Sequence, residues 1–351
     1  MFRKALPLTP RRRRPRAVCL WALGVVVAFQ IAVGILIDQR WKEVRDPEYA
    51  LREDRLKERL HENPGKPLVL ALGSSRTANG IHAERLSGTL SGEDVLVFNA
   101  GIPKSGPFLQ QVYLERLRAE SIRPDYLLLE LMPAYLDERA ANEMRLLDAS
   151  RLDLQEMTQV GISLSTPWRR WTVSRLLPFS RFGAELHENW NLREDRAKRQ
   201  ESEALDTHGW RPVDHTAAER ITRTQIAHSQ YDVAYRDFKL GLEALRRFEN
   251  LLSTARQDGI PTAVILLPEG TEFRDRTGPA MRNTLCELTE KFQREWGVKV
   301  IDARDWIEDA GFYDMHHLNP DGARAFTDRL TGVLYPSFIK PGRASARAAG
   351  R

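Results

Sequence analysis

Hydrophobic residues occur along much of the chain in short runs separated by segments of mixed polarity. Segments 76–90, 107–120, 276–296 and 320–332 have the spacing of amphipathic helices. Short, nearly continuous apolar runs that alternate with helices are typical of parallel strands covered on both faces. The pattern therefore predicts an α/β fold with a doubly wound, five-stranded parallel sheet. The predicted strands are 68–73 (LVLALG), 94–98 (DVLVF), 126–131 (YLLLEL), 262–267 (TAVILL) and 298–301 (VKVI).

One apolar run, residues 17–37 (AVCLWALGVVVAFQIAVGILI), is much longer than the others, and Gln30 is its one polar residue. About 20 apolar residues cross the roughly 30 Å hydrocarbon core of a membrane. The apolar part of a cleaved signal peptide has roughly 7–15 residues and is followed by small residues, which residues 38–41 (DQRW) do not provide. We therefore expect a retained transmembrane helix rather than a cleaved signal peptide.

The charge is unevenly distributed along the 351 residues. The chain has 53 basic and 48 acidic residues, but residues 1–16 hold seven of the basic ones and residues 340–351 hold four, with no acid in either segment. Because positively charged flanks stay in the cytoplasm, we expect an inner-membrane protein with a cytoplasmic N-terminus and an extracytoplasmic, periplasmic body. The body itself is mildly acidic, and the basic tract at Arg11–Arg16 is short and abuts the apolar run. We therefore expect no nucleic-acid partner.

The remaining sequence divides into segments that differ in charge density and in hydrophobic pattern. Residues 38–66 are charge-dense and predict a stalk helix that ends near Asn63-Pro64-Gly65. Residues 132–261 do not continue the alternation of strands and helices and predict a helical insertion, in which 231–257 form one long helix. Cys19 and Cys286 are too far apart in this plan for a disulfide, and no metal-type Cys/His spacing occurs. The predicted organisation is a basic cytoplasmic tail (1–16), a transmembrane helix (17–37), a stalk (38–66), an α/β domain (67–335) with the insertion 132–261, and a basic C-terminal tail (336–351).

Residues with catalytic potential follow the first and the last predicted strands. Ser75 lies on the turn between the first strand and a helix, where backbone N–H groups point at a bound group. A serine here can also serve as a helix N-cap. Asp314 and His317 precede a helix start at Asn319-Pro320, and this spacing lets Asp314 hold one ring nitrogen while the other takes a proton from a serine. Since the carboxyl ends of parallel strands meet at one edge, we expect Ser75, Asp314 and His317 to form one catalytic group.

This combination resembles the SGNH (GDSL-like) hydrolase superfamily. In that family the nucleophile follows the first strand in a G-D-S motif, and D-x-x-H precedes the C-terminal helix. Gly73-Ser74-Ser75 matches the first motif with Ser in place of Asp, and Asp314 and His317 match the last. The resemblance implies a flavodoxin-like fold, Ser75 as nucleophile, His317 as general base and Asp314 as its orienting partner. It implies no metal and no organic cofactor.

The two middle motifs of the family match less completely. Asn99 and Gly101 resemble the second block, whose oxyanion-binding amide would come from Lys104 or Gly106. The third block, G-x-N-D, is absent, and Ala134 stands at about the position of its Asn. Losing one oxyanion donor typically costs about 10²–10³ in rate. Gln, Tyr, Arg or water could replace it.

Three further residues are candidates for substrate binding. Arg76 is the nearest cation to the nucleophile, although it could also be an ordinary arginine on a helix surface. Glu269 and Arg274 follow the fourth strand, where they could line the substrate cleft or belong to an ordinary loop.

The anchored G-S-S-R variety resembles the envelope-modifying branch of the superfamily. That implies a serine acyl-esterase or acyltransferase that acts on cell-envelope carbohydrate esters. Its partners would be envelope polysaccharide or another acylated glycan, and a membrane-bound acyltransferase. The alternative is a catalytically weak or inactive assembly factor that binds glycan or such an acyltransferase. The missing Asn favours the alternative, and the intact Ser75, Asp314 and His317 oppose it. Whether water or a sugar hydroxyl accepts the acyl group stays open.

Overall fold

The computed structural model describes residues 14–89, 95–138, 143, 147–160, 166–190, 205–335 and 337–339. Most of the two predicted basic tails lies outside these residues. The chain divides into two compact units, Met1–Pro47 with Asp148–Arg193 and Glu48–Leu147 with Glu194–Arg351. This division differs from the predicted boundaries, because the first unit includes part of the predicted insertion.

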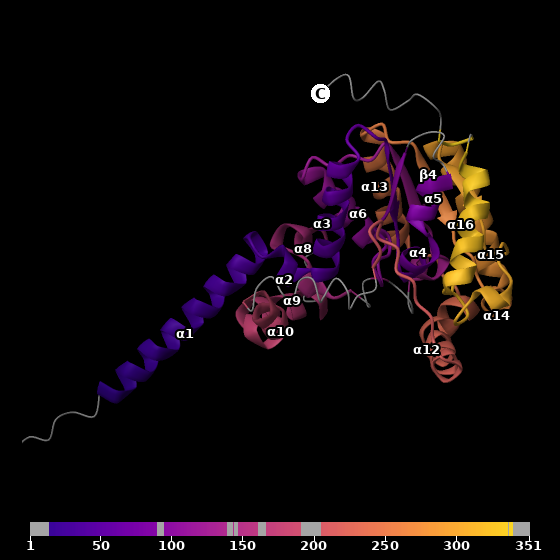
Figure 1. The fold of residues 1–351 in the computed structure, drawn as a ribbon. Helices are drawn as coiled ribbons and strands as arrows, with labels where there is room; N and C mark the ends of the chain where they lie inside the picture. The colour runs from indigo at the N-terminus through magenta and orange to yellow at the C-terminus, as the bar shows by residue number, and fades with distance from the viewer. Residues whose placement is uncertain are drawn as a thin grey trace, which may run out of the picture. The chain divides into compact units, whose positions relative to one another are not determined.

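A five-stranded sheet forms the centre of the larger unit (Figure 1). Its order is β2-β1-β3-β4-β5, and all four neighbouring pairs are parallel. This is the strand order of flavodoxin-like doubly wound sheets, so the predicted fold class is confirmed. The strands are β1 (Leu68–Leu72), β2 (Leu96–Asn99), β3 (Tyr126–Glu130), β4 (Thr262–Leu266) and β5 (Lys299–Asp302).

Helices cover both faces of this sheet (Figure 1). On one face α6 (Pro107–Ala119) packs against α13 (Leu242–Gln257), and on the other α16 (Pro320–Leu334) packs against α4 (Ser75–Gly80) and α5 (Ala83–Thr89). The helix predicted over 76–90 is thus two helices, separated at Ile81-His82. The segment predicted over 276–296 forms α15 (Pro279–Lys291) followed by a π-helical turn, Phe292–Trp296.

The single helix predicted over 231–257 was wrong. The structure has α12 (Ala217–Arg236) and α13, separated by a short extended segment. There the backbone pairs with residues after β3: Lys239 N–H donates to the Asp137 carboxylate at 3.0 Å, and Gly241 N–H donates to the carbonyl of Leu136 at 2.7 Å. Because these groups are engaged outside a helix, the helix cannot continue through them.

Most of the predicted stalk belongs to the α/β unit. The segment forms α2 (Lys42–Arg45), which belongs to the smaller unit, and α3 (Pro47–Glu62), which belongs to the α/β unit from Glu48 onward. The ring of Tyr49 stacks on that of Tyr113 in α6, with centroids 5.1 Å apart, and Lys57 Nζ lies 2.8 Å from the Glu120 carboxylate. The sparse apolar positions of α3 therefore pack on the domain.

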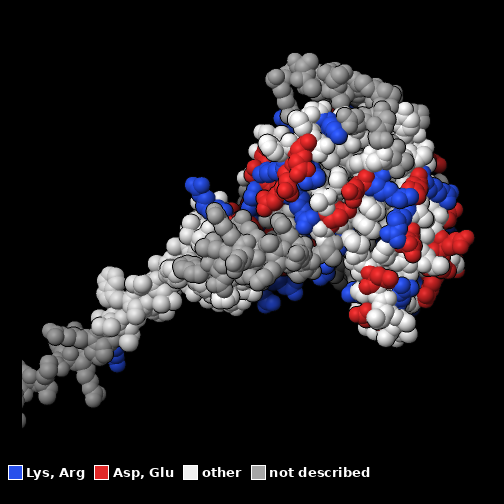
Figure 2. Space-filling model, viewed as in Figure 1, with Lys and Arg blue, Asp and Glu red and all other residues white. Residues whose placement is uncertain are grey.

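The smaller unit contains one long apolar helix, α1 (Arg14–Gln39), whose residues Arg16–Gln39 are long and apolar enough to cross a membrane. Figure 2 shows the middle of α1 without charged side chains. The end of α1 packs against α9 (Thr166–Leu176) and α10 (Pro178–Trp190). There Arg175 Nη2 lies 2.6 Å from the Asp38 carboxylate.

Candidate active site

The turn from β1 into α4 presents two adjacent serines with different roles. Ser74 is the N-cap of α4, and its Oγ accepts a hydrogen bond from Arg76 N–H at 3.1 Å. Ser75 is the first residue of the helix, and its Oγ lies 2.8 Å from His317 Nε2. The capping role considered for a serine at this turn therefore belongs to Ser74, and the hydroxyl of Ser75 meets a base.

Glu130, at the end of β3, holds this turn in place, and the sequence analysis missed it. The buried carboxylate accepts hydrogen bonds from Ser74 N–H at 2.6 Å, Ser74 Oγ at 2.9 Å and Thr77 Oγ1 at 2.7 Å. A Cβ on Gly73 would lie 2.4 Å from a Glu130 carboxylate oxygen, so glycine is needed for this approach. The signal in the sequence was an acid at the end of a buried apolar strand.

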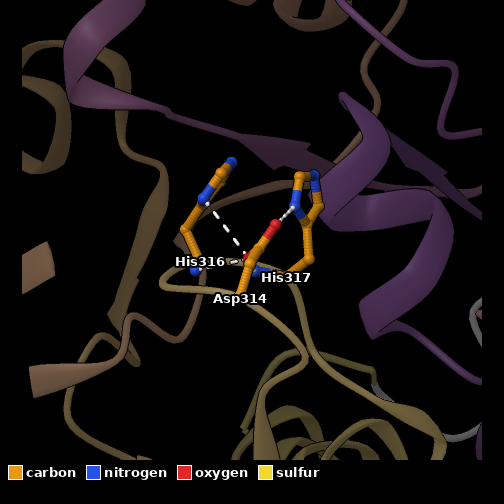
Figure 3. A group of neighbouring side chains, drawn as sticks. All are labelled: Asp314, His316 and His317. Carbon is orange, nitrogen blue, oxygen red and sulfur yellow. Dashed lines mark hydrogen bonds and ion pairs between the residues drawn. The ribbon is translucent and has the colours of Figure 1, made fainter. Parts of the chain in front are cut away.

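Asp314 and His317 lie on the loop before α16 and complete a hydrogen-bonded chain (Figure 3). Asp314 Oδ2 lies 2.7 Å from His317 Nδ1, and Oδ1 accepts from the backbone N–H groups of His316 and His317 at 2.9 and 2.7 Å. Burial by itself would raise the pKa of Asp314, but the two imidazoles and these hydrogen bonds hold it well below its usual range. The carboxylate is therefore charged and can stabilise a positive His317 ring.

The neighbouring His316 has a different environment. Its ring is buried and stacks on Phe273, with centroids 5.0 Å apart, and its Nδ1 lies 3.5 Å from Asp314 Oδ1. Burial and the adjacent His317 lower its pKa well below the usual value, so His316 stays neutral. The ring of His317 lies against Tyr313 and reaches Ser75. The geometry for proton transfer thus belongs to His317.

Asp314, His316 and His317 also offer three potential metal ligands within 4.8 Å of one another. The Asp314 carboxylate, however, is already committed to His317 Nδ1 and two backbone N–H groups. A metal at this place would have to displace the hydrogen bond that orients His317. The donor set fits a proton-transfer chain better than a metal site.

The residues of the second block differ in which N–H groups they leave free. Gly101 N–H donates to Asn99 Oδ1 at 2.9 Å, and Gly106 N–H donates to the Glu143 carboxylate at 2.8 Å. Lys104 has a left-handed backbone conformation (φ 65°) and lines the pocket beside Ser75. Within the described part of the chain, the N–H groups of Lys104 and Ser75 donate to no other group. Of the two amides that the sequence left open, Lys104 is the one available to an oxyanion.

Arg76, Glu269 and Arg274 are not where substrate binding would need them. Arg76 is buried, and its Nη2 donates to the carbonyls of Leu267 and Pro268 at 2.9 and 3.0 Å and lies 3.5 Å from Glu269. A buried guanidinium needs an acid, and Glu269, itself buried, supplies it. Arg274 donates to the carbonyl of Glu269. None of the three lines the pocket at Ser75.

Ala134 likewise offers nothing to the pocket. It is fully buried in a 3-10 turn, Pro133–Leu136, whereas the next residue, Tyr135, lines the pocket. Tyr135 is thus the polar side chain that the segment after β3 presents to the site.

The pocket at Ser75 and His317 has a volume of about 400 Å³. Half of its lining comes from the segment 132–261, for which the sequence offered no motif. These residues are Tyr135, Arg211, Val213, His215, Arg223, Ile226, Ala227, Gln230 and Tyr231.

Comparisons with known proteins add little to this geometry. No family model matches the chain. No curated protein matches it either. A "putative acylhydrolase" from Bacteroides fragilis is similar in structure, with a TM-score of 0.37, 10% identity, and coverage of 81% of this chain and 96% of that chain. A "putative lipolytic protein of G-D-S-L family" from Desulfitobacterium hafniense has a TM-score of 0.34, 10% identity, and coverage of 77% and 100%. Similarity at this level carries no argument about function, which has to come from the site itself.

Proposed function

We propose that this protein is a serine ester hydrolase or O-acyltransferase of the SGNH (GDSL-like) type. The observation that carries the proposal is the chain of hydrogen bonds from Ser75 Oγ to His317 Nε2 (2.8 Å) and from His317 Nδ1 to Asp314 (2.7 Å). It lies at the carboxyl edge of the sheet and opens into a pocket. A serine, a base and an orienting acid in this order form the arrangement needed for nucleophilic acyl transfer.

The reaction follows from these contacts. His317 Nε2 takes the proton of Ser75 as Oγ attacks the acyl carbonyl, and the carbonyl oxygen becomes an oxyanion. The N–H groups of Ser75 and Lys104 donate to this oxyanion. When the intermediate collapses, the C–O bond to the alcohol breaks and His317 returns the proton to the leaving oxygen. Water or a sugar hydroxyl then gives its proton to His317 and attacks the carbonyl carbon of the acyl-serine. When this second intermediate collapses, the bond from that carbon to Ser75 Oγ breaks, the acyl group leaves on the attacking oxygen, and His317 returns the proton to Oγ.

Tyr135 replaces the side-chain donor that the family places near Ala134. Burial raises the pKa of Tyr135 well above its usual value, so the hydroxyl keeps its proton and can donate. Its side chain lines the pocket, as does that of Tyr231. Tyr135→Phe should therefore lower kcat for ester turnover, whereas Tyr126→Phe, away from the pocket, should not.

The membrane anchoring and the envelope substrate belong to the same proposal. The apolar part of α1 comes directly after the basic residues 11–16 in the sequence and would hold the α/β unit outside the cytoplasm. The pocket is lined by polar and charged groups together with a few apolar ones, which suits a carbohydrate ester. A membrane-bound acyltransferase is the proposed source of the acyl group.

Ester turnover by the full chain in detergent tests the proposal. We expect slow hydrolysis of p-nitrophenyl acetate that is lost in Ser75→Ala, and acetylated sugar as an additional product when an oligosaccharide acceptor is present. Absence of turnover in the wild-type protein, or turnover that survives in Ser75→Ala, would contradict the proposal and favour the non-catalytic assembly factor.

A further inference from the structure

Three cationic side chains of the pocket lining have no acidic partner among the residues that the structure describes. Arg211 is half-buried, and Arg223 and Lys104 are exposed. Within the described residues, none of these three side chains makes a hydrogen bond or an ion pair. Arg85, by contrast, pairs with Asp328 on the surface. Unpaired guanidinium groups on a pocket wall are available to a ligand.

The acids of the same pocket do not cancel this charge. Glu48 lies 3.6 Å from Arg52 Nη1, which balances it. That leaves the Asp314 carboxylate, hydrogen-bonded to His317, as one negative charge against three positive ones in the lining. The wall that carries Arg211, Arg223 and Lys104 therefore has an excess of positive charge next to the nucleophile.

Arg211 is held in place by its own loop. Its backbone N–H donates to the carbonyl of Ala78 at 2.9 Å, and Trp210 Nε1 donates to the carbonyl of Asn79 at 2.7 Å. Gly209 has a φ of 86°, and a Cβ there would lie 2.0 Å from the carbonyl oxygen of Asn99. The loop is therefore packed directly against the end of α4, the helix that begins with Ser75.

Arg223 is positioned by α12, whose side chains at a spacing of three to four residues line the pocket: Arg223, Ile226, Ala227, Gln230 and Tyr231. Both arginines line the same pocket as Tyr313. The ring of Tyr313 in turn stacks on that of His317, with centroids 5.3 Å apart. The cations thus lie close to the reacting groups.

We propose that this wall binds an anionic carbohydrate, a sugar that carries a carboxylate or a phosphate, so that its ester or its hydroxyl reaches Ser75. The guanidinium groups of Arg211 and Arg223 bind the anion through their N–H groups. Val213 and Ile226 offer apolar surface to the C–H face of the sugar ring. This inference rests on the proposed function for the reaction, but binding does not require Ser75 to react.

Isothermal titration calorimetry on the full chain carrying Ser75→Ala measures binding without turnover. The probes are tetragalacturonate, its methyl ester and a phosphorylated oligosaccharide of the same length. We expect the uncharged methyl ester to bind at least about tenfold more weakly than one of the two anionic probes. The anionic probe that binds more tightly shows whether the ligand carries a carboxylate or a phosphate. Arg211→Gln and Arg223→Gln should each weaken binding of that anion about tenfold. Arg236→Gln, on the same helix but outside the pocket, is the matched control.

Equal affinity for the methyl ester and both anionic probes, no binding of any probe at millimolar concentration, or an equal loss in Arg236→Gln would overturn the inference. The circular dichroism spectrum of each variant separates lost binding from lost folding. Covalent labelling of wild-type Ser75 tests the proposed function separately. Labelling without selectivity for anions removes only this inference, whereas selective binding without labelling removes only the catalytic proposal.

A second surface, in the smaller unit, carries an independent inference. The turn between α9 and α10 exposes four large apolar side chains, Val173, Leu176, Leu177 and Phe179, each 46–52% accessible. The Phe179 ring stacks on Phe29 of α1, with centroids 5.9 Å apart. A Cβ on Gly34 would lie 2.6 Å from the Arg175 carbonyl oxygen. This turn therefore lies beside the C-terminal half of α1, between Phe29 and Gly34.

If α1 crosses the bilayer, groups packed beside Phe29 and Gly34 lie at the depth of the lipid chains. We infer that the α9–α10 turn is embedded in the outer leaflet, with its apolar side chains in lipid and the exposed Arg169 and Arg170 near the headgroups. Arg175, next to this turn, is not a free charge, because it forms an ion pair with Asp38 of the same unit.

Fluorescence quenching measures this depth. In a Cys19→Ser, Cys286→Ser background, Leu177→Cys carries an environment-sensitive dye and the protein is reconstituted into phosphatidylcholine–phosphatidylglycerol vesicles. We expect a blue-shifted emission that is quenched by spin labels on the lipid chains and not by aqueous iodide, whereas Gln257→Cys shows the reverse. Quenching of Leu177→Cys by iodide in vesicles that retain the protein would overturn the inference. A protein that fails to enter the vesicles would instead remove the proposed anchor.

Discussion

At the residue scale, two adjacent histidines differ in what their rings meet. His317 joins Ser75 and Asp314, whereas His316 is buried against Phe273. His317→Ala should lower kcat for ester hydrolysis by about 10³-fold or more, because the serine loses its base. His316→Phe, which keeps an aromatic ring in the same place, should lower it less than about tenfold. Steady-state kinetics on both variants checks this, and a dead His316→Phe beside an active His317→Ala would contradict it.

The negative charge of Asp314 should make the stability of the fold depend on pH. Its pKa in the folded protein is below that in the unfolded chain, which is about 4. The carboxylate therefore stabilises the fold above that pH, and the stabilisation is lost as the pH falls below it. Asp314→Asn should lower the free energy of unfolding by about 2 kcal/mol at pH 7, and the difference from wild type should shrink between pH 5 and pH 3. Urea unfolding at each pH measures it, and a constant difference would argue against a charged Asp314.

At the scale of elements, the turn between β1 and α4 depends on β3, which is the neighbour of β1 in the sheet. Glu130 accepts three hydrogen bonds from Ser74 and Thr77. Glu130→Gln replaces one acceptor by a donor, so at least one of these groups loses its partner, at about 1–3 kcal/mol. We expect a lower melting temperature. We also expect kcat to fall by a larger factor than the factor by which KM changes, because the turn no longer holds Ser75 in place. Glu295→Gln, on the surface, is the control; unchanged kcat in Glu130→Gln would contradict this positioning role.

The sheet was predictable because buried parallel strands are nearly continuous apolar runs, as in β1 and β4, and such runs have few other interpretations. The breaks in helices were not, because tertiary contacts cause them. The gap between α12 and α13 results from hydrogen bonds to residues 136–137, about 100 positions away. Nothing local in 237–241 signals that pairing.

The same distinction explains what was predictable of the site. Ser75, Asp314 and His317 stood out because each lies in a short motif at a strand or helix end. Arg211, Arg223 and Tyr135 are ordinary residues locally, and only the fold brings them to Ser75. Arg76 was a reasonable candidate by proximity in sequence, but burial turned its side chain toward Glu269.

At the scale of the whole molecule, the orientation of α1 decides which compartment the site faces. Alkaline phosphatase fused after Arg351 should be active if the body is outside the cytoplasm, because that enzyme folds only there. Replacing Arg11–Arg14 by Gln should reduce the activity of the fusion, since these charges hold the N-terminus inside. A fusion of green fluorescent protein, which fluoresces only in the cytoplasm, is the matched control. A fluorescent fusion beside an inactive phosphatase would contradict the orientation.

Whether Ser75 is a nucleophile is tested most directly by a fluorophosphonate probe on the full chain in detergent. The activated serine attacks phosphorus, fluoride leaves, and the adduct is read by intact-mass and peptide mass spectrometry. We expect one adduct, on Ser75, absent in Ser75→Ala and at least about 10³-fold slower in His317→Ala. The adjacent variant Ser74→Ala should still react at Ser75. An unlabelled wild-type protein, or an adduct on another residue, would contradict the assignment of Ser75, His317 and Asp314 as a catalytic group.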